Sequence, residues 1–157
     1  MKVARIITND LANGPGIRVS VFVSGCPHHC MNCHNPQLWD PAVGHELSGN
    51  ILYQILHLLH DNDIKRGLSI LGGEPLAPYN LDGTTELCRF IKDKSPNTNI
   101  WLWTGYDFTE IKNFDIINYV DGIVDGKFIE SLKTGDTLWR GSSNQRIYTK
   151  KTFILTE

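Results

Sequence analysis

Short strand-like stretches alternate with helical ones along most of this chain, and that alternation constrains the fold more than any other feature of the sequence. The strand-like stretches are residues 3–8, 17–23, 68–71, 99–103 and 122–124. Helices are predicted over residues 50–59, 84–94 and 109–114, and the end of the segment 139–150 is again strand-like. This alternation predicts an α/β fold with a mostly parallel sheet and right-handed crossovers.

Length and composition indicate a single-domain protein. The 157 residues are 41% hydrophobic and 20% charged, with a formal net charge of -2, so we expect residues 1–157 to form one domain. A sequence pI of about 6.3 disfavours proteins that bind nucleic acid or an anionic membrane surface. Residues 1–10 lack the layout of a signal peptide, and the apolar stretch 19–23 is far shorter than the ~20 residues that span a bilayer. We therefore expect a cytoplasmic protein with no nucleic-acid or membrane partner.

Loops with small and polar residues follow several of the predicted strands. Residues 24–39 follow the second strand, a Gly-Gly-Glu-Pro turn at residues 72–75 follows the third, and Thr104-Gly105-Tyr106 follows the fourth. Ligands of parallel sheets bind at the carboxyl ends of the strands. We therefore expect these loops to share one edge of the sheet.

Most of the cysteines are crowded into the first of these loops. Cys26, Cys30 and Cys33 form a C-x3-C-x2-C pattern, with Cys88 far away. Disulfide frameworks use cysteines spread through small secreted chains, so this cluster indicates metal binding or redox chemistry. Thiolates this close on one loop can each ligate a different iron of a four-iron cluster, which leaves one iron without a protein ligand. Such an open coordination site is typical of catalytic metals, and a substrate with adjacent amine and carboxylate groups could chelate the iron.

Other functions of the cysteines compete with a four-iron cluster. A structural zinc site would take a fourth ligand from His28, His29, His34 or Cys88. Zinc sites usually combine two short-spaced pairs, whereas this chain offers one triplet. A thioredoxin-like pair of Cys30 and Cys33 leaves Cys26 without a role, and an electron-transfer ferredoxin needs a fourth cysteine soon after Cys33.

The combination of motifs resembles a known superfamily. C-x3-C-x2-C is the signature of the radical S-adenosylmethionine (SAM) enzymes, Cys33-His34-Asn35 resembles the continuation found in their glycyl-radical activases, and the turn at 72–75 resembles their SAM-amine motif. More narrowly, the chain is similar to the activating proteins of anaerobic ribonucleoside-triphosphate reductases. The similar segments are residues 13–18, 22–26, 103–106, 124–128 and 139–145. Many superfamily members carry an aromatic residue at the position of Asn32, where it can stack on adenine. A contact from the backbone of residues 32–34 to SAM would survive this change, and the sequence leaves open whether Asn32 uses its side chain or its backbone.

The resemblance implies the cofactors and the reaction. Cys26, Cys30 and Cys33 would hold a 4Fe-4S cluster, and SAM would chelate the fourth iron. The residues expected to bind SAM are Asn32, Cys33, His34, Gly72, Gly73 and Glu74. A reduced flavodoxin-type donor would supply the electron that cleaves SAM, and the resulting 5′-deoxyadenosyl radical would take a hydrogen from a glycine of an anaerobic ribonucleoside-triphosphate reductase. The cofactors carry this chemistry, so no side chain is expected to act as an acid or base.

The resemblance also implies an architecture and a use for the turn. A complete (β/α) barrel takes ~250 residues, so the expected fold is an incomplete (β/α) barrel whose open side receives a protein partner. Gly72 and Gly73 allow close approach of a ligand because they lack a Cβ. Their carbonyl groups could accept from the SAM ammonium, and the Glu74 carboxylate would add charge attraction.

The sequence leaves two other functions open. One is activation of another glycyl-radical enzyme, or radical SAM chemistry on a metabolite; the other is a zinc-binding interaction module without catalysis. Several residues near the motifs are predicted to be structural: Arg18 and Arg140 as surface arginines (with a pairing to the SAM carboxylate or the partner as the alternative), His28 and His29 as exposed polar residues, Cys88 as a buried helix residue, and Trp101 and Trp103 as sheet packing.

Overall fold

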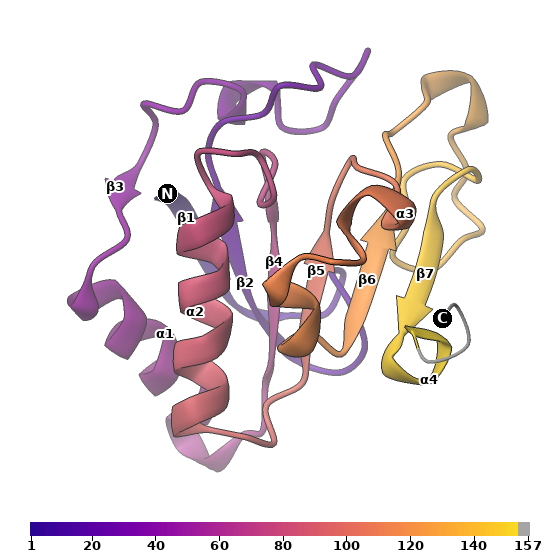
Figure 1. Cartoon of the computed structure of the whole chain (residues 1–157). Coiled ribbons are helices and arrows are strands. Elements are labelled where there is room, and N and C mark those ends of the chain that lie inside the picture. The colour runs from indigo at the N-terminus through magenta and orange to yellow at the C-terminus, as the bar shows by residue number, and fades with distance from the viewer. Residues whose placement is uncertain (154–157) are drawn as a thin grey trace.

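The computed structural model describes residues 1–153. Within them seven strands form one sheet in the order β3-β1-β2-β4-β5-β6-β7 (Figure 1). The strands are β1 (Lys2–Asp10), β2 (Arg18–Val23), β3 (His45–Glu46), β4 (Gly67–Gly72), β5 (Ile100–Trp103), β6 (Gly122–Asp125) and β7 (Arg146–Thr149). The α/β fold with a mostly parallel sheet is confirmed.

The centre of the sheet is parallel and its edges are antiparallel. Strands β2, β4, β5 and β6 pair in parallel, whereas β1 pairs antiparallel with both β2 and β3, and β7 with β6. Only the short loop 11–17 joins β1 to β2, which is too short for the crossover that a parallel pair needs. The sheet is therefore mixed.

One face of this sheet is covered by α1 (Gly49–His60), α2 (Leu81–Lys94), α3 (Phe108–Ile111) and the 3-10 turn η3 (Asp115–Asn118). The remaining elements are the short helix α4 (Lys150–Phe153) after β7 and the 3-10 turns η1 (Pro36–Leu38), η2 (Asp61–Asp63) and η4 (Glu130–Leu132). Figure 1 shows α1 and α2 side by side over the parallel strands. The buried side chains between these helices and the sheet include Ile55 and Leu59 of α1, Leu87 and Ile91 of α2, and Val21, Ile70 and Leu102 of the strands. No helix within residues 1–153 has the length and apolar content to cross a membrane.

Both long helices begin earlier than the apolar pattern predicts. Ser48 caps α1, since its Oγ accepts from the backbone N–H of Ile51 at 3.4 Å. Residues 76–80 connect the turn at 72–75 to α2. Thr84, the predicted start, lies inside the first turn of the helix, and its Oγ1 donates to Pro75 O at 2.7 Å. The residue before α2, Asn80, donates from its side chain to Ser24 O at 2.9 Å and to Glu74 O at 3.0 Å. The helix start is thus tied to both loops that carry the sequence motifs.

The opposite face of the sheet carries polar and aromatic side chains. Arg18, Ser69 and Trp101 lie on it and are buried, although α1 and α2 pack on the other face. Ser69 Oγ donates to Asn13 O at 2.6 Å, and the rings of Trp101 and Trp139 meet edge to face at 5.1 Å. Segments 11–17 and 139–145 therefore cover this face, through Asn13 and Trp139.

Candidate active site

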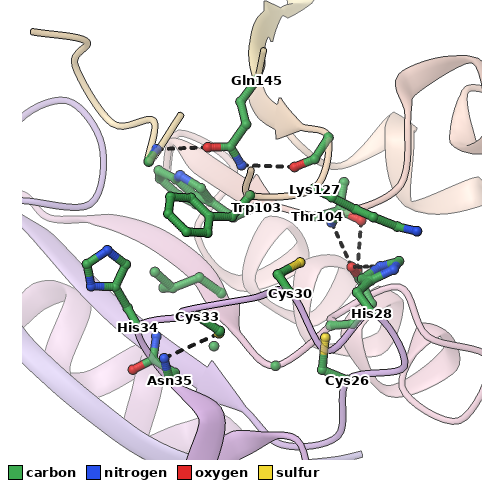
Figure 2. A pocket seen from close by; sticks show the side chains of 18 of the residues that line it. Cys26, His28, Cys30, Cys33, His34, Asn35, Trp103, Thr104, Lys127 and Gln145 are labelled. Atoms are coloured by element: carbon green, nitrogen blue, oxygen red, sulfur yellow. Dashed lines mark hydrogen bonds and ion pairs between the residues drawn. The ribbon is translucent and has the colours of Figure 1, made fainter. Parts of the chain in front are cut away.

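The carboxyl ends of β2, β4, β5 and β6 surround a cavity of about 420 Å³. Its walls come from the loop after β2, the turn after β4, the residues after β5 and β6, and two segments from the far ends of the chain, residues 12–13 and 139–145. Figure 2 shows Cys26, Cys30 and Cys33 on one loop, with Trp103, Lys127 and Gln145 across the cavity. The prediction that the motif-bearing loops share one edge of the sheet is confirmed.

Backbone hydrogen bonds close the base of the cysteine loop. The N–H of Gly25 donates to Leu38 O at 2.7 Å, and the N–H of Cys26 donates to Trp39 O at 3.1 Å. Within the loop the N–H of Cys33 donates to Cys30 O at 3.1 Å. These bonds hold the loop against the end of β2 and keep its thiols on the cavity side.

The three thiols of the loop are free and partly buried. Burial raises the pKa of both Cys26 and Cys30, and the Glu74 carboxylate adds to the rise at Cys26. The backbone N–H of His28 donates to the Cys26 sulfur and that of Phe128 to the Cys30 sulfur, and these hydrogen bonds oppose the rise of each pKa. Sulfur atoms with N–H donors around them suit an iron–sulfur cluster, whose cysteine sulfurs commonly accept such bonds.

Cys88 lies in a different part of the fold. It is fully buried in α2, within the apolar core, and burial raises the pKa of its thiol to about 12. The prediction that Cys88 is a buried helix residue is confirmed. Among residues 1–153 no three His, Cys, Asp or Glu side chains lie together as they would around a single metal ion.

The glycines of the turn after β4 pack on backbone. Gly72 has a φ of +113°, and a Cβ on it would lie 2.7 Å from Val23 O. A Cβ on Gly73 would lie 2.5 Å from Gly25 O. The N–H of Gly73 donates to Val23 O at 2.8 Å, so the turn lies directly against the chain that leads into the cysteine loop. Close chain packing already requires both glycines, and their contact with SAM stays a prediction.

Glu74 has a different set of partners from the one the sequence predicts. Its side chain is 1% exposed, and its carboxylate accepts from Leu76 N at 2.9 Å, Thr104 Oγ1 at 2.7 Å, Gly105 N at 2.7 Å and His28 Nε2 at 2.8 Å. Four donors from the protein occupy its two oxygen atoms. The expected charge attraction from Glu74 to SAM stays a prediction, but the carboxylate joins three loops.

The histidines near the cysteines differ from one another. The prediction that His28 is exposed is wrong, because its side chain is 8% exposed and bonded to Glu74. His29 is exposed as predicted, and its ring stacks on Trp39 at 4.6 Å. His34 lines the cavity and meets the Phe128 ring at 5.9 Å. Asn32 is exposed, with a φ of +55°. It is not among the described residues that line the cavity.

The sequence is similar to a known family over most of its length. The family described as "4Fe-4S single cluster domain" matches residues 12–148. A protein of Enterobacteria phage T4, named anaerobic ribonucleoside-triphosphate reductase-activating protein, is 41% identical over 148 residues, or 94% of each chain. Proteins of the same name from Vibrio cholerae serotype O1 and Escherichia coli K12 are 42% and 39% identical over 142 residues, or 88% of this chain and 92% of theirs. The chain belongs to this family of reductase-activating proteins.

Some residues that line the cavity were not predicted as site residues from the spacing of the cysteines, but they lie in segments that resemble the activating-protein family. Trp103, predicted as sheet packing, also lines the cavity, and its Nε1 donates to Trp139 O at 2.8 Å. Arg140 lines the cavity too, and its Nη1 donates to Gln145 O at 3.0 Å. Gln145 Oε1 accepts from Gly141 N at 2.8 Å. All of these residues fall in segments 103–106 and 139–145, which are among those that resemble the family.

The other predicted surface arginine is buried. Arg18 is 1% exposed, so its prediction as a surface residue is wrong. Its guanidinium donates to Ser69 Oγ at 2.8 Å, Asn99 Oδ1 at 2.8 Å and Leu68 O at 2.6 Å. These bonds leave Arg18 under the cavity wall as part of the sheet face.

Proposed function

We propose that this protein is the activating enzyme of an anaerobic ribonucleoside-triphosphate reductase, and that it uses a 4Fe-4S cluster and SAM. The observation that carries the proposal is that the three thiols of C-x3-C-x2-C line one cavity together with the Gly72–Gly73 turn. The fourth cysteine lies in the core, so the loop offers thiolates to three irons and leaves one iron for another ligand. The names of the relatives support the reductase as the target.

Each part of the cavity has a task in this proposal. When bound, the cluster and SAM supply the one-electron chemistry that ends in removal of a hydrogen atom from a glycine Cα of the reductase. Cys26, Cys30 and Cys33 ligate three irons. The carbonyl oxygens of the turn accept from the SAM ammonium; that of Gly73 accepts no hydrogen bond within residues 1–153 and is free for this. The backbone of residues 32–34 contacts the rest of SAM.

The architecture suits a protein substrate. In our proposal residues 1–157 work as one domain, an incomplete (β/α) barrel whose helices cover the outside of the sheet and whose inner face bounds the cavity. The polar and aromatic face with Arg18, Ser69 and Trp103 would be this inner face. A glycine on a flexible segment of the reductase would enter from the open side.

The electron comes from a reduced flavodoxin-type donor in this proposal. Met31 lies between two of the cysteines and is 77% exposed. The cysteine loop, residues 24–39, which we also call the cluster loop, therefore lies at the surface. A donor can therefore approach the cluster without entering the cavity. The exposed apolar side chain of Met31 offers such a donor a contact next to the ligands.

The test uses protein purified without oxygen and reconstituted with iron and sulfide. Dithionite and SAM are added, the EPR spectrum is recorded, and 5′-deoxyadenosine is assayed. We expect a reduced-cluster signal that changes on addition of SAM, formation of 5′-deoxyadenosine, and a glycyl-radical signal when the reductase is added. Bound zinc without iron would instead support a structural site and overturn the proposal.

Cysteine variants sharpen this test. Cys26→Ala, Cys30→Ala and Cys33→Ala are expected to lose the SAM-responsive cluster and all activity. Cys88→Ala is the matched control, and it should keep both because Cys88 lies in the core. A fully active Cys30→Ala protein would contradict the ligand assignment.

A further inference from the structure

The middle of the cluster loop contacts the residues after β6 through Cys30 and His34, which meet Phe128, and the turn after β4 through His28. His28 lies between Cys26 and Cys30, and its Nε2 donates to Glu74 Oε2 at 2.8 Å. The backbone bonds that join this loop to the turn after β4 involve Gly25, at the base of the loop, whose carbonyl accepts from Glu74 N at 2.7 Å. Among the hydrogen bonds of residues 1–153, the His28 bond thus connects the cysteine-bearing middle of the loop to the Gly-Gly-Glu turn.

The surroundings of His28 are shaped to the imidazole ring. A Cβ on Gly105 would lie 2.5 Å from His28 Cδ2, so the absence of a side chain at position 105 makes room for the ring. Tyr106 meets the ring edge to face, with centroids 4.7 Å apart at 72°. The 8% exposure of the His28 side chain shows that the site is closed around it.

Glu74 connects this ring to two other elements. One of its oxygens accepts from Gly105 N as well as from His28 Nε2, and the other accepts from Thr104 Oγ1 and Leu76 N. A carboxylate with four donors is held in one orientation. It therefore also fixes the orientation of a side chain that donates to it, such as His28. The loop after β2, the turn after β4 and the end of β5 therefore meet at one buried carboxylate.

We propose that His28 is a positioning residue, which fixes the cluster loop relative to the SAM-binding turn through its hydrogen bond to Glu74. This inference rests on the proposed function. The Glu74 carboxylate then acts through His28 rather than as a direct partner of the SAM ammonium, which leaves the ammonium to the carbonyl oxygens of the turn. Outer hydrogen-bond partners of metal ligands commonly matter in this way.

The test compares two substitutions at position 28. His28→Leu removes the donor and keeps an apolar side chain, whereas His28→Gln keeps an N–H donor at a similar reach. We expect His28→Leu to bind as much iron and sulfide as the unmodified protein, but to need roughly 10- to 100-fold more SAM for the SAM-induced change in the EPR spectrum. The same rise should appear in the KM for SAM during 5′-deoxyadenosine formation. His28→Gln should restore most of the loss.

A second variant keeps the proposal testable if His28→Leu fails to fold. Glu74→Gln replaces one acceptor oxygen with an NH2 group, so the N–H of either Gly105 or Leu76 loses its acceptor and the arrangement of four donors around the side chain is broken. If the two side chains act as one link, the SAM requirement of the double variant His28→Leu/Glu74→Gln should be no greater than that of the worse single variant. His57→Leu, at an exposed position on α1, is the control and should match the unmodified protein.

The outcomes separate this inference from the function on which it rests. A normal SAM titration for cluster-loaded His28→Leu would overturn the positioning role and leave the function standing. Loss of the cluster in both His28→Leu and His28→Gln would also overturn it, because the ring would then be needed to build the cluster. If the unmodified protein itself shows no SAM-dependent signal and no 5′-deoxyadenosine, the proposed function fails.

Discussion

The guanidinium of Arg18 lies inside the protein, and its Nε donates to Ser69 Oγ at 2.8 Å. Ser69 Oγ in turn donates to Asn13 O at 2.6 Å, and Asn13 lines the cavity. Within residues 1–153 no carboxylate forms an ion pair with Arg18, so the Ser69 hydroxyl, the Asn99 amide oxygen and backbone carbonyl groups solvate the charge. Burial accordingly lowers the pKa of this arginine to about 10. A buried cation thus holds the loop 11–17 against the sheet.

We predict that Arg18→Met destabilises the protein by roughly 3 kcal/mol or more, because several buried acceptors lose a charged donor. Arg18→Lys should recover part of the loss, since an ammonium carries fewer donors and lacks the planar fork. Urea unfolding of equally loaded samples measures both. Arg89→Met, at an exposed position on α2, should change stability by less than about 0.5 kcal/mol. A similarly small effect of Arg18→Met would show that the buried network contributes little.

A second prediction separates chain packing from ligand approach at the turn. Gly73→Ala places a Cβ 2.5 Å from Gly25 O and 3.0 Å from Leu38 O, which is backbone and cannot rotate away. We expect a loss of roughly 1–3 kcal/mol in unfolding free energy even without SAM. A Cβ on Gly49, at the start of α1, meets nothing within 4 Å, so Gly49→Ala should leave stability unchanged or slightly raised. If Gly73→Ala weakened only SAM binding, ligand approach alone would explain the glycine.

The third prediction concerns the reactivity of the thiols. Thiolates are the reactive form, and at pH 8 a thiol with a pKa of about 12 is ionised in about one molecule in ten thousand. Iodoacetamide should therefore modify Cys26, Cys30 and Cys33 of the cluster-free protein and leave Cys88 unmodified until the chain unfolds. Mass spectrometry of digested protein measures this. Modification of Cys88 in the folded protein at the rate of the others would contradict its burial.

The same thiol has a consequence for stability at high pH. Its pKa is raised from the ordinary 9.0 to about 12 in the folded protein, so the folded state favours the neutral thiol. The contribution of the Cys88 thiol to the free energy of unfolding is therefore fully present below pH 9 and is lost as the pH rises toward 12. Cys88→Ala removes that part of the loss, so the stability of the variant should fall less steeply over this range.

The fold could be predicted from sequence where local pattern decides it. The parallel strands followed from short apolar stretches such as residues 68–71, and α1 from the spacing of Ile55 and Leu59, because these patterns reflect one buried face. The start of α2 was missed because Thr84 bonds to Pro75 and Asn80 bonds to the loop after β2. Those bonds come from tertiary contacts, which no local pattern contains.

The sequence predicts the loops that carry the cysteines and the Gly-Gly-Glu turn, but not the buried polar residues that hold these loops in place. The cysteine spacing and the Gly-Gly-Glu turn identify the loops that meet, since parallel strands end at one edge. The burial of His28 and Arg18 could not be read from the sequence, because each is decided by a partner far along the chain: Glu74 for His28 and Asn99 for Arg18. Burial of a polar side chain costs free energy unless such a partner satisfies it.

Two tryptophans provide the last prediction. Trp103 Nε1 donates to Trp139 O at 2.8 Å, whereas Trp39 Nε1 is buried without a hydrogen-bond partner in the described part of the chain. Trp139 has a φ of +60°, which is an unfavourable left-handed conformation for a non-glycine residue. The bond from Trp103 helps to hold it there. Trp→Phe removes the same atoms at both positions and removes a hydrogen bond at only one.

Trp103→Phe should therefore be less stable than Trp39→Phe by about 1 kcal/mol, since loss of Trp39 Nε1 removes an unsatisfied donor rather than a bond. Urea unfolding of the two variants gives the difference directly. Hydrogen exchange should also become faster at Gly141 and Ser142, whose N–H groups donate to Gln145 Oε1 at 2.8 and 3.2 Å, because the segment 139–145 loses its attachment to β5. Equal stabilities and unchanged exchange would mean that the ring contact between Trp139 and Trp101, and not the hydrogen bond, fixes this wall of the cavity.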